Sequence, residues 1–334
     1  MPDTLVERGI RCLLFDLGDT LWYRESQEGW DKLEGASNRH AIDLLRRHVN
    51  PSLLPKLDDE ALGHALRRAF DAQVRATIRN EPLLEPDAIH AVACVLQRWG
   101  FVEMDRSLCL SLFEALRVRI PNSRPLFPDT LSTLAEMRRR GYLLGIVTNR
   151  LWGGKPFLED LRAIGLLDYF DLAHIAISGD LGLRKPNPRI FEHVLNALGA
   201  SPQETAMIGD SLSADILGAQ PLGIYAIWKP KPWLSEWARA HAASQPPPPS
   251  SGRPQLPSGA FPGEDTADTQ IAEPLETPDA PPRGMYVTDD DYILARANTS
   301  RDYLEQFRRG EIRPDRIISQ ISELLEIFPG AAQP

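Results

Sequence analysis

Cysteine is scarce in this sequence, with three such residues among 334, at positions 12, 94 and 109. No C-x-x-C pair occurs, which argues against a disulfide scaffold or a thiolate zinc site and fits a reducing compartment. The seven histidines show no metal-ligand spacing. No run approaches the ~20 apolar residues that cross a bilayer, and the acidic first residues do not resemble a signal peptide. The sequence predicts a soluble, cytoplasmic protein without a membrane partner.

Basic residues are fewer than acidic residues. Lys and Arg number 37 against 46 Asp and Glu, which gives a formal net charge of −9. Because nucleic-acid affinity comes from clustered cations, we expect no nucleic-acid partner. Apolar residues make up 43% of the chain, ordinary globular usage, and the length favours roughly two domains.

Proline gathers in one segment, because eleven of the 29 prolines lie between Pro246 and Pro282. Proline removes backbone donors, and this segment has few large apolar residues, so burial cannot offset the entropy of ordering it. We therefore expect residues 241–310 to form a mostly disordered insertion. Recruitment of a protein partner through P-x-x-P segments is the alternative use of such an insertion.

Two hydrophobic periodicities divide the rest of the chain. Between residues 22 and 125, apolar residues recur every three or four positions, which predicts a unit of about four helices. These helices are expected at 30–48, 58–78, 86–99 and 107–118. Elsewhere, short apolar runs alternate with amphipathic segments, which predicts βαβ units and a parallel sheet with both faces covered. The strands are expected at 11–16, 142–149, 172–178, 205–210, 223–228 and 315–319, and the helices at 129–140, 157–164, 190–198, 213–220 and 322–328.

The predicted fold class is therefore α/β. Its core consists of residues 1–21, 126–240 and 311–334. The helical unit of residues 22–125 and the proline-rich insertion interrupt that core.

Polar residues follow four of the expected strands. They are Asp16 and Asp19 after the first, with Gly18 between them, Thr148 and Asn149 at the second, Lys185 after the third, and Asp210 and Asp215 after the fourth. An Asp after a strand ordinarily caps the next helix. Ligands of open parallel sheets bind beyond the carboxyl ends of the strands, so this recurrence at four strand ends favours a shared site.

The residue types at this edge suit phosphate chemistry. Carboxylates, together with backbone and water oxygens, are ligands for a hard cation such as Mg²⁺. A bound phosphate needs further positive charge and hydrogen-bond donors, which a lysine, a hydroxyl and backbone amides supply. A carboxylate facing the phosphate can attack it and form an acyl phosphate, which divides the displacement into two steps. These residue types therefore predict a phosphate group as the ligand.

Four segments, FDLGDTL, GIVTN, GLRKPNPRIF and IGDSLSADILGA, occur in this order and resemble the four motifs of the haloacid dehalogenase-like (HAD) hydrolases. The resemblance covers residues 10–21 and 126–229 closely, and 315–328 loosely. It implies a Rossmann-like three-layer core. The helical unit between the first and second motifs implies the subfamily with an α-helical cap at that place.

The resemblance implies a Mg²⁺ site. Asp16 would be both the nucleophile and a metal ligand, and the backbone carbonyl of Gly18 would be a second ligand. Asp210 would be the acidic ligand from the fourth motif. Asp215 matches the second acid of that motif, which more often orients the metal ligands through hydrogen bonds than binds the metal directly.

The resemblance also implies residues that hold the substrate. Thr148 and the backbone of Asn149 would hold the transferred phosphoryl group, and Lys185 would neutralise the nucleophile and the phosphate. Arg24, which follows the first motif and enters the cap, is a candidate contact for a second anionic group of the substrate.

One position departs from the phosphatase pattern D-x-D-x-T, whose second Asp is the general acid/base. Here Gly18 occupies that position, and the neighbouring acid is Asp19. Loss of a general acid typically costs 10²–10⁴-fold in rate. Three explanations remain: Asp19 or a cap residue takes the role; the leaving group needs little protonation, as in an acyl phosphate or a sugar 1-phosphate; or the reaction differs.

The preferred prediction is a Mg²⁺-dependent phosphatase that acts on a small phosphorylated metabolite through an aspartyl phosphate on Asp16. One alternative is another hydrolysis of the superfamily, such as dehalogenase- or phosphonatase-like cleavage. The retained metal-binding acids count against dehalogenation, because displacement at a C–halogen bond does not need them. The other alternative is a catalytically weak binding or regulatory relative that recruits a partner through the proline-rich insertion.

Overall fold

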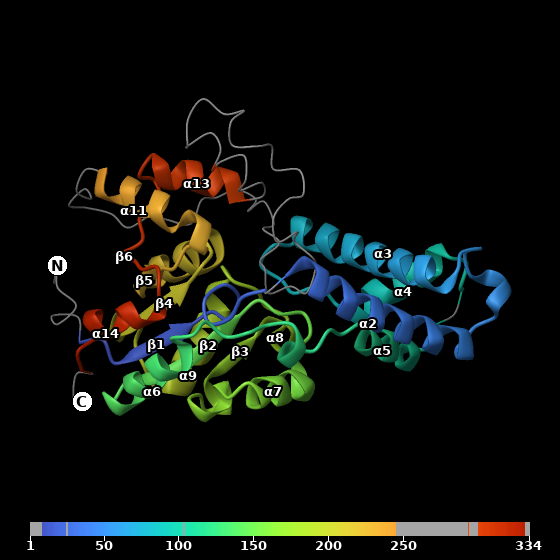
Figure 1. The fold of residues 1–334 in the computed structure, drawn as a ribbon, viewed down its shortest axis with the longest axis horizontal. Helices are drawn as coiled ribbons and strands as arrows, with labels where there is room; N and C mark the ends of the chain where they lie inside the picture. The colour runs from blue at the N-terminus through green and yellow to red at the C-terminus, as the bar shows by residue number, and fades with distance from the viewer. Residues whose placement is uncertain (1–8, 25, 103, 245–292, 294–299, 331–334) are drawn as a thin grey trace.

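A parallel sheet of six strands forms the centre of the α/β part of the chain (Figure 1). The computed structural model describes residues 9–24, 26–102, 104–244, 293 and 300–330. From one edge to the other, the strands are β3 (Ile175–Ile177), β2 (Leu143–Thr148), β1 (Cys12–Phe15), β4 (Thr205–Gly209), β5 (Tyr225–Trp228) and β6 (Arg316–Ile317). Every neighbouring pair is parallel. The predicted fold class is confirmed, and the strand after the proline-rich segment returns to the sheet beside β5.

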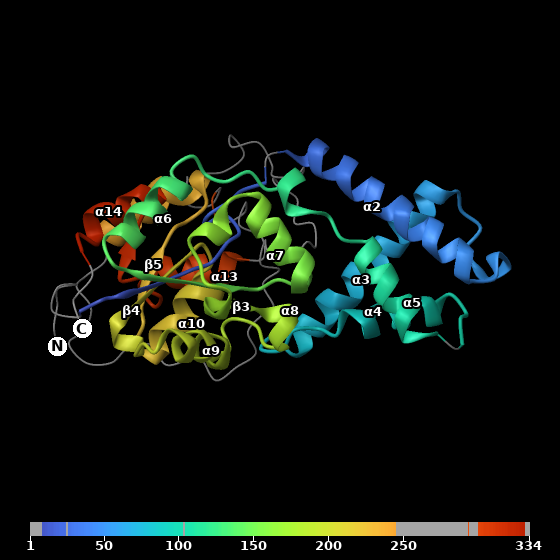
Figure 2. The ribbon, with the colours of Figure 1, turned by 90° about the horizontal axis from the view of Figure 1, so that it is seen from below.

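Helices cover both faces of the sheet. One face packs against α6 (Thr130–Arg139), α7 (Gly154–Ala163) and α14 (Leu324–Ile327), and the other against α9 (Pro188–Leu198), α10 (Leu217–Ala219), α11 (Ser235–Ser244) and α13 (Arg301–Arg308). Figure 2 shows α6 and α14 on the side of the sheet opposite to α9 and α10. The side chains of β1 alternate between the faces: Leu13 and Phe15 join the first apolar core, Cys12 and Leu14 the second. The result is a three-layer core.

Four further helices gather on one side of this core (Figure 1). They are α2 (Gln27–His48), α3 (Asp59–Asn80), α4 (Ala88–Arg98) and α5 (Arg106–Ala115). Each begins after a residue whose side chain accepts hydrogen bonds from the first turn, namely Ser26, Asp58, Asp87 and Asp105. Their apolar faces enclose a third core. We call these helices the cap. Its division from the rest of the chain at residues 22 and 125 stays a prediction.

Two chain segments lead from the sheet into the cap and back, and the side chain of Trp152 reaches into the cap from the sheet. The two segments pair with each other, since the amide of Tyr23 donates to the carbonyl of Pro125 at 3.0 Å. Trp152 follows β2, yet its ring stacks on Phe113 of α5 at 4.9 Å between centroids, and its Nε1 donates to the Phe113 carbonyl at 2.9 Å. Trp152 therefore belongs to the apolar core of the cap.

The structure extends the α/β part beyond its predicted limits. The predicted insertion at 241–310 begins inside α11 and ends beyond α13, and these two helices pack together, with Trp237 and Phe307 5.9 Å apart between ring centroids. Both helices belong to the second apolar core because their aromatic side chains cover the sheet beside β5. Residues 246–282, which carry the proline-rich prediction, lie outside the described residues.

Several helices and strands are shorter or more tightly wound than expected. The helix predicted at 213–220 is a π-helical turn, Leu212–Ile216, followed by α10. The strand predicted at 172–178 begins with a 3₁₀ turn before β3, and the four-residue helix α8 (Ser178–Leu181) follows it. The 3₁₀ turns are Pro51–Leu53, Ile120–Asn122, Leu166–Asp168, Leu172–His174, Pro202–Glu204, Gln220–Leu222, Pro232–Leu234 and Ile321–Glu323. Within the described residues, no helix is both long and apolar enough to cross a membrane.

Candidate active site

The carboxyl ends of three central strands hold residues of the predicted site. Asp16 directly follows β1, Thr148 ends β2, and Asp210 directly follows β4. Lys185 reaches the same place from the loop between α8 and α9, and its Nζ lies 2.5 Å from Oδ1 of Asp16. Asp16, Thr148 and Lys185 are buried, whereas Asp210 is partly exposed. Residues 169 positions apart in the chain are thus brought into direct contact.

Lys185 lies among three oxygen acceptors. Besides Asp16, its Nζ contacts Oδ1 of Asp215 at 2.7 Å and donates to the carbonyl of Val147 at 2.7 Å. Burial alone would lower the pKa of the lysine, but the carboxylates of Asp16 and Asp215 outweigh burial and hold its pKa above the ordinary value. The two buried carboxylates therefore favour the charged form of Lys185.

Asn149 fixes the backbone of the lysine loop. Its Oδ1 accepts a hydrogen bond from the Lys185 amide at 2.7 Å, and its Nδ2 donates to the Lys185 carbonyl at 3.0 Å. The resemblance implied a role for the Asn149 backbone toward the phosphoryl group, and that role stays a prediction. The contact of its side chain with Lys185 was not predicted, because a residue at the end of a strand does not show which loop it faces.

Three carboxylates lie close enough to share a cation. Asp16, Asp210 and Asp215 each offer an oxygen, and these atoms all lie within 4.8 Å of one another. Oxygen ligands are the donor set that Mg²⁺ prefers. The three acids outnumber the buried lysines beside them, Lys185 and Lys229, so a bound cation would offset the remaining negative charge. The donor chemistry and the charge of this cluster therefore fit the predicted metal.

Asp215 has supporting contacts that separate it from the other two acids. Its Oδ2 accepts the amide of Ser211 at 3.0 Å while its Oδ1 faces Lys185. The carboxylate lies directly against Gly209, where an added Cβ would lie 2.1 Å from Oδ2. Only glycine leaves room for the Asp215 carboxylate there. These contacts agree with an orienting role for Asp215, which remains a prediction.

Asp19 pairs with a lysine that is not part of the cluster of acids. Its Oδ2 lies 3.4 Å from Nζ of Lys231, and the cluster found among the described residues does not include it. Its φ of 51° lies in the left-handed region, which short polar residues tolerate better than most. The predicted acid/base role of Asp19 stays a prediction.

Lys229 is a buried cation beside the site that the sequence analysis missed. Its Nζ donates to the backbone carbonyl of Asp19 at 2.8 Å and lies 3.7 Å from the centroid of the Phe127 ring. Burial lowers its pKa below the ordinary value, and the charges of Asp19, Asp210 and Asp129 oppose that shift. The available signal was its position, because Lys229 directly follows the apolar strand β5 just as the acids follow theirs.

Arg24 lies where the cap joins the sheet. Its guanidinium carbon is 4.6 Å from the centroid of the Trp30 ring, and that of Arg124 lies at the same distance from the same ring. Cations above an aromatic face are held by its quadrupole. The structure thus places Arg24 against the first turns of α2, and its contact with a substrate anion stays a prediction.

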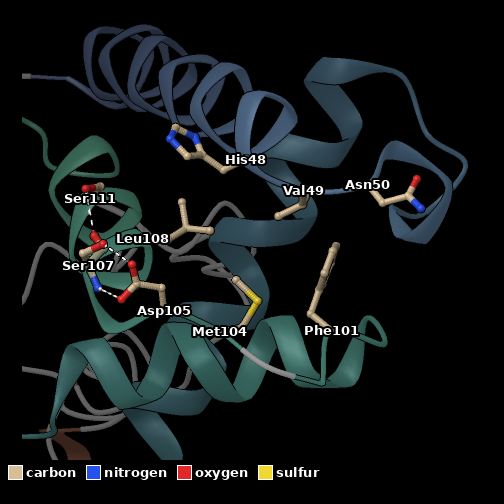
Figure 3. A pocket seen from close by; sticks show the side chains of 9 residues that line it. All are labelled: His48, Val49, Asn50, Phe101, Met104, Asp105, Ser107, Leu108 and Ser111. Atoms are coloured by element: carbon tan, nitrogen blue, oxygen red, sulfur yellow. Dashed lines mark hydrogen bonds between the residues drawn. The ribbon is translucent and has the colours of Figure 1, made fainter.

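A cavity of about 430 Å³ lies within the cap (Figure 3). Its lining residues are His48, Val49, Asn50, Phe101, Met104, Asp105, Ser107, Leu108 and Ser111. Figure 3 shows the Asp105 carboxylate turned toward Ser107, whose amide and hydroxyl donate to it at 3.0 and 2.5 Å. This cavity contains none of the predicted site residues.

Comparison with known proteins agrees with this geometry. The family model described as haloacid dehalogenase-like hydrolase matches residues 10–223. The chain belongs to this family of hydrolases.

Among curated relatives, a phosphoserine phosphatase of Thermus thermophilus is 43% identical over 131 residues, which cover 39% of this chain and 48% of that protein. A glyceraldehyde 3-phosphate phosphatase of Pyrococcus furiosus is 36% identical over 229 residues, which cover 66% and 81%. The chain thus spans about half the length of the first of these relatives and four fifths of the second. The crystal structure of a HAD phosphatase from Thermococcus onnurineus aligns with 25% identity and a TM-score of 0.42 over 66% of this chain and 86% of that one.

Proposed function

We propose that this protein is a Mg²⁺-dependent phosphatase of a small phosphorylated metabolite and that Asp16 is its nucleophile. The observation that carries the proposal is the contact of Lys185 with both Asp16 and Asp215 beside the partly exposed Asp210. Curated relatives that match this chain over both short and long segments are phosphatases, which supports the same class of reaction.

In the first step, a carboxylate oxygen of Asp16 forms a bond to the phosphorus of the substrate. The ester P–O bond breaks on the opposite side, and the leaving oxygen takes a proton from water. The ammonium of Lys185 fixes the orientation of the Asp16 carboxylate and offsets the negative charge of the incoming phosphate. The hydroxyl of Thr148 and the amide of Asn149, at the end of β2, donate to the phosphoryl oxygens.

In the second step, water attacks the phosphorus of the aspartyl phosphate. The P–O bond to Asp16 breaks, inorganic phosphate leaves, and the carboxylate is restored. Asp16, Asp210 and the carbonyl of Gly18 would hold Mg²⁺, and Asp215 would orient these ligands without binding the metal itself. When bound, the metal offsets phosphate charge that one lysine cannot balance alone.

Gly18 favours substrates whose leaving group needs little protonation. Gly18 carries no carboxyl group at the position where the phosphatase pattern has its general acid, and Oδ2 of the neighbouring Asp19 lies 3.4 Å from Nζ of Lys231. Acyl phosphates and sugar 1-phosphates lose their leaving groups readily and fit this site better than simple alkyl phosphates. Hydrolysis of a C–halogen bond remains the less favoured alternative, because it would not require the clustered carboxylates.

The proposal is tested with a panel of phosphorylated metabolites and a chromogenic aryl phosphate, each with Mg²⁺ and with a chelator. We expect phosphate release that requires Mg²⁺ and falls at least ~10³-fold in Asp16→Asn, because the amide removes the nucleophilic charge. Asp31→Asn, which changes an exposed acid of α2, is the matched control and should retain wild-type activity. Equal turnover by Asp16→Asn and wild type would show that the nucleophile is assigned wrongly.

A further inference from the structure

The cap makes backbone contact with the loop that carries Lys185. The segment between α3 and α4 lies antiparallel to this loop, with a bridge between Leu84 and Leu183. The amide of Glu85 donates to the carbonyl of Gly182 at 3.1 Å, and the amide of Arg184 donates to the carbonyl of Leu83, also at 3.1 Å. We call this pairing of residues 83–85 with 182–184 the clasp. Figure 2 shows α8, which leads into the loop, on the side of the core that faces the cap.

A buried ion pair closes the clasp. Nη1 of Arg184 donates to Oε2 of Glu85 at 2.7 Å, and both side chains are only 2% exposed. The other carboxylate oxygen, Oε1, is buried and accepts no hydrogen bond from the described part of the chain. Because a buried charge is costly without a partner, removing either member of this pair would leave the other unfavourably placed.

The clasp and the core hold the Lys185 loop from two directions. On the core side, the side chain of Asn149 bonds both backbone groups of Lys185. On the cap side, the adjacent residue Arg184 is held by Leu83 and Glu85, and Nδ2 of Asn187 donates to the Leu83 carbonyl at 3.1 Å. The placement of the lysine therefore depends on contacts from both units.

We infer that Glu85 is a positioning residue: through its ion pair with Arg184, it couples the docking of the cap to the placement of Lys185 against Asp16. The catalytic significance of this coupling rests on the proposed function. Misplacing a catalytic group by about 1 Å can cost on the order of 10²-fold in rate, so a cap that docks through the lysine loop would favour turnover when the site is covered.

Chemical labelling of lysines tests the inference without a substrate. Lys185 is buried and paired, so an amine-reactive acetylating reagent should modify it slowly in the full-length protein, whereas the exposed Lys32 is modified fast and serves as the reference. In Glu85→Gln, a neutral amide of the same shape replaces the counter-charge of Arg184. We expect acetylation of Lys185 to become at least ~10-fold faster, which corresponds to a loop that opens more often.

Three controls separate this effect from general loosening. Glu136→Gln alters a Glu–Arg pair of α6 far along the chain from the clasp and should leave Lys185 as slow as in wild type. Lys229, buried on another loop, should keep its wild-type rate in Glu85→Gln. The exchanged pair, Glu85→Arg with Arg184→Glu, should return acetylation of Lys185 to within threefold of wild type.

The outcomes show whether Glu85 specifically holds Lys185 in place or only contributes to the general stability of the protein. Faster acetylation of Lys185 with unchanged Lys229, together with a fall of roughly tenfold in kcat for an aryl phosphate, would support the inference. An unchanged rate at Lys185, an equal rise at Lys229, or a rise that the exchanged pair does not reverse would overturn it. If the wild type released no phosphate from any substrate, the proposed function would fail, while the labelling would still decide whether Glu85 holds the loop.

Discussion

Removal of the Lys185 ammonium should destabilise the protein and increase its response to Mg²⁺. The lysine lies 2.5 Å from one buried carboxylate and 2.7 Å from another, so Lys185→Met leaves Asp16 and Asp215 facing each other without this cation. Breaking a buried charge pair by removing one partner typically costs about 3–5 kcal/mol. We expect the free energy of unfolding to fall by about that amount when a chelator is present.

Magnesium should recover part of this loss, because the metal and the ammonium neutralise the same acids. A ligand present at 100 times its dissociation constant stabilises the folded state by about 2.7 kcal/mol. Without the competing charge of Lys185, the variant should bind Mg²⁺ more tightly than wild type and gain more stability from the same concentration. Its activity should nevertheless fall at least ~10²-fold, because the charge that offsets the phosphate is lost.

Urea unfolding with and without Mg²⁺ measures both effects, and Lys185→Arg, which keeps the charge, is the control. The reasoning would be refuted by a loss of less than about 1 kcal/mol in chelator, or by equal stabilisation of wild type and Lys185→Met by Mg²⁺. If Lys185→Met does not fold in chelator, recovery of the folded state on titration with Mg²⁺ replaces the unfolding measurement. Failure of Mg²⁺ to recover it would contradict the shared site.

Three further substitutions have defined outcomes. Gly18→Asp restores the acid of the phosphatase pattern and should raise kcat on alkyl phosphates at least ~10-fold more than on aryl phosphates. An equal change on both would show that the absence of this general acid does not limit the wild type. Lys229→Met tests the lowered pKa of Lys229, which burial depresses in the folded protein. Between that folded pKa and the ordinary value of ~10.4, the unfolded chain binds more protons than the folded one. The stability of the wild type should therefore rise with pH in that window relative to the variant. Urea midpoints whose difference does not change with pH would contradict this. Gly209→Ala places a methyl group 2.1 Å from Oδ2 of Asp215 and should cost about 1–3 kcal/mol with weaker Mg²⁺ binding, measured by calorimetry.

The placement of the principal site residues was predictable because it depends on the sheet alone. Parallel strands end at a common edge, so the residues after β1, β2 and β4 had to come together once the strands were recognised. The apolar runs of these strands are continuous, as buried parallel strands require, and that made them recognisable. The same reasoning placed the strand β6 after the proline-rich segment.

Contacts that depend on side-chain direction were not predictable. Asn149 faces the loop of Lys185, Asp19 faces Lys231, and Glu85 pairs with a residue 99 positions away. Each pairing depends on how a loop crosses the ends of the strands, which local periodicity does not specify. The helix α11 was missed for a related reason: its aromatic side chain, Trp237, gains stability only from Phe307 of α13 and from the apolar core against the sheet.

Trp152 restricts how caps can be exchanged within such proteins. Its indole leaves the loop after β2 and completes the apolar interior of the cap, where it stacks on Phe113 and donates to the carbonyl of that residue. A foreign cap grafted onto this sheet without an aromatic partner at that place would expose a large ring only a few residues from Thr148. Recombination of caps and cores would therefore have to carry both aromatic positions together.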